Sequence, residues 1–256
     1  VRTELYTVTK NNGTRRTGIL FKQEDSNLAP TIYLEEFYQK YLKGQQVPDL
    51  ADSICSIYQE IRVKKTCDCQ NLFDFNHVKE HIVYKLIRRD ANEELLKQIP
   101  YEPFLDLAVV YYIQIDNTRF GSAAIQIRNE HLRYWCVEKE EIRRLAEKNT
   151  PRIYPVQIRQ IVRFMYVATN EQCSLGAAVM RYPDFREKVR GMIRGDFYIL
   201  PSSIHEVILV PESFGLEPER MQEMVKEINQ TGVAPEEVLS DSVYYFDGEE
   251  IRIVAK

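Results

Sequence analysis

A short polar cluster between two apolar runs is the first place where this sequence could carry out chemistry. The stretch from Phe197 to Pro211 reads F-Y-I-L-P-S-S-I-H-E-V-I-L-V-P, and the apolar runs at its two ends predict two strands joined by a tight connection. The polar residues of the connection are Ser202, Ser203, His205 and Glu206. Because histidine titrates near neutral pH and can activate a serine, the cluster could form part of a hydrolase site.

Spacing limits what this cluster can do by itself. In an extended chain Ser203 and His205 share one face and Glu206 points the other way, so Glu206 cannot orient the imidazole. A triad needs a third member, which Asp106 or Asn149 would have to supply through the fold. The alternative is a hairpin corner whose hydroxyls bond backbone groups and whose histidine packs on a neighbour.

Asp106 is the one charged residue of the otherwise apolar run Leu105–Ile115. A buried carboxylate must be paired or shift its pKa, and such groups gather at functional sites. The alternative places Asp106 at the first turn of the strand, either exposed or bonded to a backbone amide.

The segment from Cys67 to His81 contains the ligand types of a zinc site. Cys67 and Cys69 precede His77 and His81, which would share one face of a helix at positions i and i+4. The single residue between the cysteines is shorter than the usual spacer of about two to four residues. The same histidines with Glu80 also fit the inverted zincin pattern. A solvated helix face is the favoured alternative, and no cofactor is expected.

Three arginines recur at helical spacing near the middle of the C-terminal half. Arg186, Arg190 and Arg194 would form one basic ridge, which needs an anionic partner because like charges at this spacing repel. A nucleic-acid backbone, an acidic protein or the acidic C-terminal segment of this chain could supply it. The aromatic residues typical of a single-strand binder are not interleaved here.

Composition indicates an ordinary globular protein. The chain has 256 residues, a formal net charge of −4 and five cysteines, an odd number that favours reduced thiols. No apolar run approaches the roughly 20 residues of a membrane span, and the first residues lack the apolar core of a signal peptide. We expect a cytoplasmic protein without membrane contact.

Periodicity predicts an α+β fold, with an N-terminal hairpin and helices packed on a larger mixed or antiparallel sheet that has helices on one face. The expected helices are 31–44, 48–63, 75–89, 93–98, 138–148, 183–194 and 218–230. The expected strands are 4–9, 16–22, 105–115, 121–127, 165–168, 177–182, 197–200, 207–210, 242–246 and 249–254. A boundary at Pro100–Pro103 would divide residues 1–100, a hairpin with helices, from an α+β part, 101–256; the two are expected to form one integrated unit.

Several motifs along the chain resemble an uncharacterised bacterial family, a domain of unknown function that is frequent in Gram-positive gut bacteria. They are N-L-A-P-T-I-Y-L-E-E-F-Y (Asn27–Tyr38), L-D-L-A (Leu105–Ala108), W-x-V-x-x-E-E-I-x-x-L-A-x-x-N-T-P (Trp135–Pro151), P-S-S-I-H-E-V-I-L-V-P (Pro201–Pro211) and V-A-P-E-E-V-L-S-D-S-V-Y (Val233–Tyr244). The helix ending in A-x-x-N, followed by a strand with P-S-S, is more distantly similar to YtpQ-like proteins. The resemblance implies a bacterial, cytoplasmic protein and no particular activity.

No complete catalytic constellation is visible, so we expect a non-enzymatic binding or regulatory protein that acts on a protein partner. The alternatives are a hydrolase that uses the cluster at 202–206 and a nucleic-acid binder that uses the arginine ridge.

Overall fold

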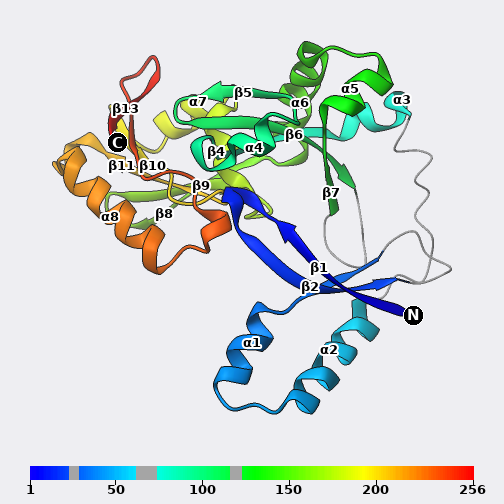
Figure 1. The fold of residues 1–256 in the computed structure, drawn as a ribbon. Helices are drawn as coiled ribbons and strands as arrows, with labels where there is room; N and C mark the ends of the chain where they lie inside the picture. Colours follow the sequence, from blue (N-terminus) through cyan, green and yellow to red (C-terminus); the bar gives the residue numbers. More distant parts are fainter. Residues whose placement is uncertain (23–28, 62–73, 116–122) are drawn as a thin grey trace.

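The protein, represented by a computed structural model, is described for residues 1–22, 29–61, 74–115 and 123–256 (Figure 1). Within these ranges helices combine with three antiparallel sheets, which confirms the predicted α+β class. No helix in the same ranges is long and apolar enough to cross a membrane.

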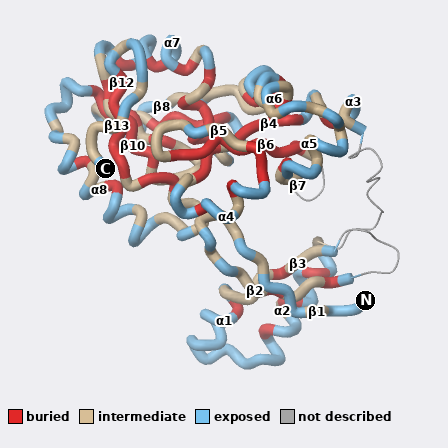
Figure 2. Tube along the Cα trace, turned by 45° about the horizontal axis from the view of Figure 1, so that its top comes forward, coloured by how far each residue is buried: buried red, intermediate tan, exposed pale blue. Residues whose placement is uncertain are grey.

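The N-terminal part forms a lobe with its own small core. Its elements are β1 (Arg2–Thr9), β2 (Arg15–Lys22), β3 (Thr31–Tyr33), α1 (Glu35–Leu42) and α2 (Val47–Ile61). The predicted hairpin is confirmed. Its turn can form because Asn12 and Gly13 adopt the positive φ angles that these residue types tolerate. The helix expected from Thr31 begins only at Glu35, since Thr31–Tyr33 pairs with β2. Figure 2 shows the few buried residues of this lobe well apart from those of the body.

The middle sheet contains the main error of the sequence-based prediction. Its strands are β4 (Ile82–Arg88), β5 (Tyr101–Phe104), β6 (Leu107–Ile115) and β7 (Ala123–Gln126). The helix predicted for 75–89 is wrong, because α3 (Phe75–Val78) and the 3-10 turn η3 (Lys79–His81) are short and β4 follows. Side chains on both faces of β4 are buried, so the strand lacks the alternation that would have revealed it. Strand β4 pairs with β6, and the sheet therefore crosses the expected boundary at Pro100–Pro103.

The six-stranded sheet has the order β13-β12-β10-β11-β9-β8. Its strands are β8 (Val156–Val162), β9 (Met165–Asn170), β10 (Phe197–Leu200), β11 (Val207–Pro211), β12 (Val243–Phe246) and β13 (Ile251–Ala255). The strand predicted for 177–182 is wrong: these residues belong largely to a buried 3-10 helix, η5 (Gly176–Arg181). The small side chains of Ala177 and Ala178 let this helix pack into the core, where neither residue is more than 1% exposed.

The remaining helices cover the sheets. They are α4 (Glu93–Leu96), α5 (Asn129–Trp135), α6 (Lys139–Ile153), α7 (Phe185–Arg190) and α8 (Pro218–Thr231). The main core lies where the middle sheet, α6, η5, α7 and one face of the six-stranded sheet meet, while α8 packs on the opposite face. Helix α6 also closes the free edge of β4, because Thr150 Oγ1 accepts a hydrogen bond of 3.0 Å from the Tyr84 amide.

Three short segments fasten the lobe to the body, and we call them the joint. They are the hairpin tip η1 (Asn11–Gly13), η4 (Asp90–Asn92) and η7 (Pro235–Glu237). The Asn12 side-chain amide donates to the carbonyls of Pro235 and Val238, at 2.9 and 2.7 Å. The Asn11 side-chain amide donates to the Glu236 carbonyl at 2.7 Å, and Arg16 forms an ion pair with the Glu236 carboxylate. Side-chain amides therefore satisfy backbone groups that would otherwise lose their water partners.

Candidate functional site

His205 lies between two backbone segments, and both of its ring nitrogens are engaged. The Leu175 amide donates to Nδ1 at 3.2 Å, while Nε2 lies 3.3 Å from Glu237 Oε1. Because Nδ1 is an acceptor, the proton of the neutral ring is on Nε2, which faces the carboxylate. Neither nitrogen is left to take a proton from a serine.

The serines of the cluster bond the backbone. Ser203 Oγ accepts a hydrogen bond of 3.1 Å from the His205 amide, and the backbone of Ser203 forms a β-bridge with Val238. The Ser202 carbonyl accepts from the Leu239 amide at 3.0 Å. Within the described residues no hydrogen bond or ion pair involves the Glu206 side chain. Ser202, Ser203 and His205 thus hold the P-S-S-I-H-E loop against the segment that carries η7.

Asp106 does not bond His205; its carboxylate instead accepts hydrogen bonds from a set of hydroxyl groups. It lies in the turn between β5 and β6, where its carboxylate accepts hydrogen bonds from Ser240 at 2.7 Å, Ser242 at 2.8 Å and the Tyr244 hydroxyl. Burial and the adjacent Asp106 charge raise the pKa of Tyr244, which stays protonated and donates. The cluster therefore fastens this turn to β12.

Asn149, the other candidate for the third member of a triad, bonds backbone carbonyls around the start of β4. Its side-chain amide donates to the carbonyls of Lys79 and Ile82, at 2.8 and 3.0 Å. The structure therefore brings neither Asp106 nor Asn149 into hydrogen-bond contact with the His205 ring, whose partners are Leu175 and Glu237.

The proposed zinc ligands are only partly visible. Cys67 and Cys69 lie outside the described residues, whereas His77 on α3 and His81 at the end of η3 are exposed. Glu80 lies 3.9 Å from both Lys148 Nζ and Arg152 Nη2, and its carboxylate therefore has two cations as neighbours. Within the described ranges no three possible metal ligands come together.

The arginine ridge is shorter than expected, because α7 ends at Arg190 and Arg194 lies beyond it. Arg186 donates to the Glu249 carbonyl and Arg190 to the Gly248 carbonyl, the latter at 2.5 Å. Both guanidinium groups also stack on the Phe246 ring, at 5.3 and 5.7 Å from its centroid. Two of the three arginines thus hold the β12–β13 turn of the same chain.

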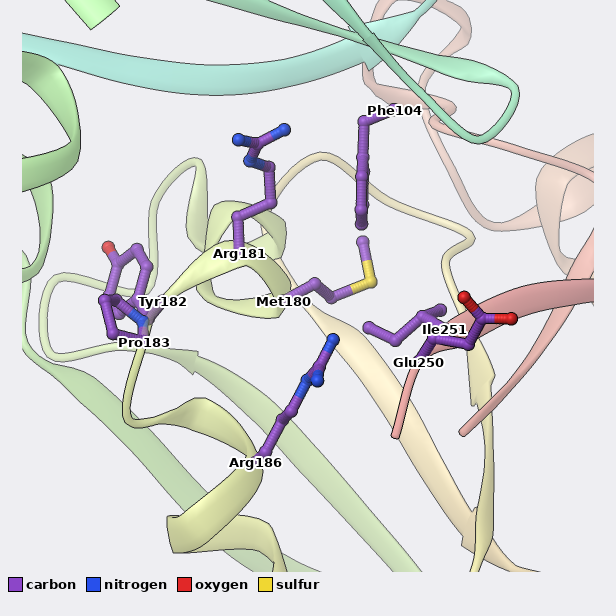
Figure 3. A pocket seen from close by; sticks show the side chains of 8 residues that line it. All are labelled: Phe104, Met180, Arg181, Tyr182, Pro183, Arg186, Glu250 and Ile251. Atoms are coloured by element: carbon purple, nitrogen blue, oxygen red, sulfur yellow. The ribbon is translucent and has the colours of Figure 1, made fainter. Parts of the chain in front are cut away.

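A cavity of about 450 Å³ opens beside these arginines (Figure 3). Arg186 extends from α7 toward Met180, and Phe104 stands on the far side of that methionine. Arg181 stacks on Phe104 at 5.3 Å and lies 3.4 Å from a carboxylate oxygen of Glu147. The positive charges around this cavity are therefore already engaged within the chain.

A larger cleft, of about 830 Å³, lies between the hairpin tip, β4 and α4. We call it the Lys85 cleft, after the lysine on its β4 wall. Around its rim stand Lys10, Glu93, Gln98, Gln126 and Arg128. The sequence does not reveal this site, because three segments that are distant in the chain, 9–13, 85–98 and 126–128, build it, and because the periodicity of 75–89 predicts a helix where β4 lies. The available signal was a single charged residue, Lys85, inside the apolar run Ile82–Ile87.

Lys85 has no anionic partner among the described residues. Its side chain is half-buried, and its ammonium lies 5.8 Å from the centroid of the Tyr112 ring. Burial lowers the pKa of Lys85, and the positive charge of Lys10 lowers it further. Lys10 likewise forms no ion pair in the described ranges; it lies 4.5 Å from the Tyr33 ring centroid, and its positive charge acts on the Glu236 carboxylate.

The opposite wall is fixed by its own hydrogen bonds. Arg128 Nη1 donates to Gln98 Oε1 at 2.9 Å, and Gln126 Nε2 donates to the Tyr111 carbonyl at 2.6 Å. The cleft therefore combines the Lys85 ammonium, which forms no ion pair in the described ranges, with a preformed wall of amide and guanidinium groups, and the carboxylates of Asp90, Glu93 and Glu94 also line it.

Comparison with known proteins places the chain in a family but identifies no activity. No curated protein and no solved structure matches it. A family model described as "Family of unknown function (DUF5688)" matches residues 1–165 and 162–248, which together are nearly all of the chain. The chain therefore belongs to this family of unknown function.

Proposed function

We propose that this chain is a non-enzymatic binding protein that holds a small anionic molecule in the Lys85 cleft. The observation that carries the proposal is Lys85, a partly buried ammonium that lines the cleft and forms no ion pair among the described residues, with Lys10 in the lining of the same cleft. A partly buried cation costs free energy unless an anion lies close to it, and a bound anionic ligand would provide that anion.

The size and position of the cleft support a small ligand. About 830 Å³ falls within the range of cavities that hold cofactor-sized and drug-sized molecules. Such sites favour the interface between two structural units, and the cleft lies where the hairpin tip of the lobe meets the body.

The same position supports a regulatory role. Asn11 and Gly13 of the joint belong to one wall of the cleft, and Lys85 and Gln126 of the middle sheet belong to another. A ligand that contacts both walls stabilises the docked lobe and shifts its equilibrium by its differential affinity. A protein partner that recognises only the docked lobe would then respond to the ligand.

The motif resemblance also implies where the protein acts, and that expectation is part of this proposal. We propose a bacterial, cytoplasmic protein whose binding requires no cofactor. The hydrolase alternative gains no support from His205, because both ring nitrogens are engaged. Nucleic-acid binding gains none from Arg186 and Arg190, because carbonyl groups of the chain occupy them.

The proposal is tested by measuring ligand-induced stabilisation. Inorganic phosphate, pyrophosphate and oxalate are titrated at constant ionic strength while the thermal midpoint is followed. We expect saturable stabilisation by at least one of these anions, which Lys85→Met and Lys10→Met each weaken. Lys43→Met removes an equal charge from an exposed position and should bind as the wild type does. No saturable response, or equal responses in all variants, would overturn the proposal.

A further inference from the structure

We infer that the amine of Lys85 forms a reversible imine with a ligand that carries both a carbonyl and an anionic group, namely an anionic aldehyde or 2-oxo acid. The inference rests on the proposed function, since it names the class of ligand that the same cleft takes.

The first argument is the position of the amine. Lys85 projects from β4 into a cleft of about 830 Å³, and it is held by a strand that pairs along its whole length with β6. Within the described ranges the ammonium forms no hydrogen bond or ion pair, and it lies 5.8 Å from the centroid of the Tyr112 ring. A nucleophile must be free to reach its target, and this amine is not engaged in an ion pair.

The second argument is the charge state that the surroundings favour. An amine attacks a carbonyl only in its neutral form, and lysines that perform this chemistry are desolvated or lie near another cation. Both conditions hold for Lys85, because burial and Lys10 lower its pKa. The titratable and charged groups that line the cleft around it are Lys10, Asp90, Glu93, Glu94 and Arg128.

The third argument is that the neighbouring cations suit the anionic end of the ligand. Lys10 and Arg128 line the same cleft as Lys85, and Arg128 is oriented by its bond to Gln98. Ile87 and Leu95 add apolar surface to the lining. A short ligand can thus place its carboxylate or phosphate near the cations and its carbonyl carbon at Lys85.

The reaction requires no further reagent. The lone pair of the neutral Lys85 nitrogen forms a bond to the carbonyl carbon, and the carbonyl oxygen takes up a proton to give a carbinolamine. The carbon–oxygen bond then breaks and the hydroxyl group leaves as water, after taking up a second proton. Nitrogen gives one of its two protons back to solvent and keeps the other. The product is a protonated imine, with no change of oxidation state, and hydrolysis reverses it.

The experiment uses glyoxylate, a small anionic aldehyde, with cyanoborohydride to trap any imine as a stable secondary amine. Intact mass and peptide mapping then locate the adduct on the full chain. We expect labelling at Lys85 to be several-fold faster than at exposed Lys43, and oxalate to protect Lys85 by occupying the cleft. Lys85→Arg should lose this adduct, because a guanidinium does not form the imine.

Two readouts separate the inference from the proposed function. Oxalate has no reactive aldehyde or ketone, so its effect on the thermal midpoint of the wild type measures anion binding alone. If oxalate binds in a Lys85-dependent way while glyoxylate labels all exposed lysines equally, the inference is wrong and the binding proposal stands. If phosphate, pyrophosphate and oxalate all fail to bind the wild type and to protect Lys85, the proposed function fails together with the inference. The protection measurement needs no variant, so a misfolded variant does not prevent a decision.

Discussion

Asn12 and Asn92 bind each other through two reciprocal hydrogen bonds. The Asn12 backbone amide donates to Asn92 Oδ1 and Asn92 Nδ2 donates to Asn12 Oδ1, both at 3.0 Å. The two residues are 80 positions apart, one on the lobe and one on the body. Because Asn92 lines the Lys85 cleft, this pair fixes the distance between two walls of the proposed binding site.

Replacing Asn92 with alanine should loosen the lobe without unfolding the body. Asn92 is only 4% exposed, so its loss takes these partners from the partly buried Asn12 backbone N–H and Oδ1, at a cost of about 2 kcal/mol. Hydrogen exchange should accelerate at η1 and in the β1–β2 strands next to it, and less in β6. Gln45→Ala, which removes an exposed carboxamide, is the control. Unchanged exchange at the hairpin tip in Asn92→Ala would contradict the role assigned to the pair.

Asp106→Asn should destabilise the attachment of the β5–β6 turn to β12. The carboxylate accepts from three hydroxyl groups, whereas a carboxamide has a single acceptor oxygen and presents donors where acceptors are needed. We expect a loss of about 2 kcal/mol in the free energy of unfolding, measured by urea denaturation. Asp52→Asn, on the exposed face of α2, should be nearly neutral. Equal midpoints for the two variants would show that the hydroxyl cluster contributes nothing to stability.

Gly176→Ala should be among the most damaging single-methyl changes in the chain. A Cβ atom at this position would meet Thr169 Oγ1 and the His205 carbonyl oxygen at impossible distances, and the Asn170 amide at 2.8 Å. The backbone must move, and we expect a loss of about 3 kcal/mol or more.

Gly232→Ala provides the matched comparison. The nearest atom to its new Cβ would be the Ile228 carbonyl oxygen at 3.4 Å, an ordinary contact. Thermal melts should therefore separate the two alanine variants clearly. A melting temperature for Gly176→Ala close to that of Gly232→Ala would mean that the loop before η5 can relax, and that His205 is held less rigidly than the structure indicates.

Reversing the charge of Arg186 and Arg190 together should release the β12–β13 turn. Each guanidinium gives up a carbonyl hydrogen bond and a stacking contact with Phe246, which together should cost about 1 to 2 kcal/mol. Hydrogen exchange in β13 should rise. Arg194→Glu reverses a single arginine charge at an exposed position beyond α7, and it should leave hydrogen exchange in β13 unchanged. Should the double variant instead keep its β13 protection while losing salt-sensitive binding to DNA, the ridge would be a nucleic-acid surface.

Lys85→Met should stabilise the protein in a pH-dependent way. The pKa of Lys85 in the folded protein lies below its ordinary value of 10.5, so the unfolded chain takes up this proton more readily. The cost to the wild type is complete below the folded pKa and disappears as the pH rises to 10.5. The variant should therefore be more stable than the wild type at neutral pH, with a gain that shrinks in alkaline solution.

Urea midpoints measured from neutral to alkaline pH test this dependence. Lys43→Met controls for general charge effects and should show no comparable trend. A stabilisation of Lys85→Met that is constant over the whole range would indicate improved packing and not removal of a buried charge. Other titratable groups line the cleft and could contribute to the pH dependence of the urea midpoints. They are Lys10, Asp90, Glu93, Glu94 and Arg128.

Local signals in the sequence predicted the local parts of the fold. The tips at Asn12-Gly13 and Asp247-Gly248 combine residue types that accept positive φ, and both hairpins form. The amphipathic stripes of α2 and α8 are equally local. Strand β4 was mistaken because burial on both faces removes the alternation, and η5 because small residues packed in a core carry no periodic signal.

The site residues could be predicted only as single positions. Asp106 stands out in the sequence as a carboxylate in an apolar run, but its hydroxyl partners are separated from it by 134, 136 and 138 residues. His205 was recognised as the centre of its loop, but Glu237 and Leu175 come from other segments. The Lys85 cleft depends on the same kind of long-range assembly, and no spacing rule along one segment encodes it.

The joint also sets the order in which the protein can be completed during synthesis. Asn11 and Glu236 are separated by 225 residues, and a ribosome that adds about 5–20 residues per second needs roughly 10–45 s between them. The lobe can form its own core in that time, and η4 becomes available to the hairpin tip once Asn92 has been made, whereas the contacts with η7 do not yet exist. The residues that line the Lys85 cleft end at Arg128, so the cleft can assemble well before Glu236 is made, and the η7 side of the joint is completed later.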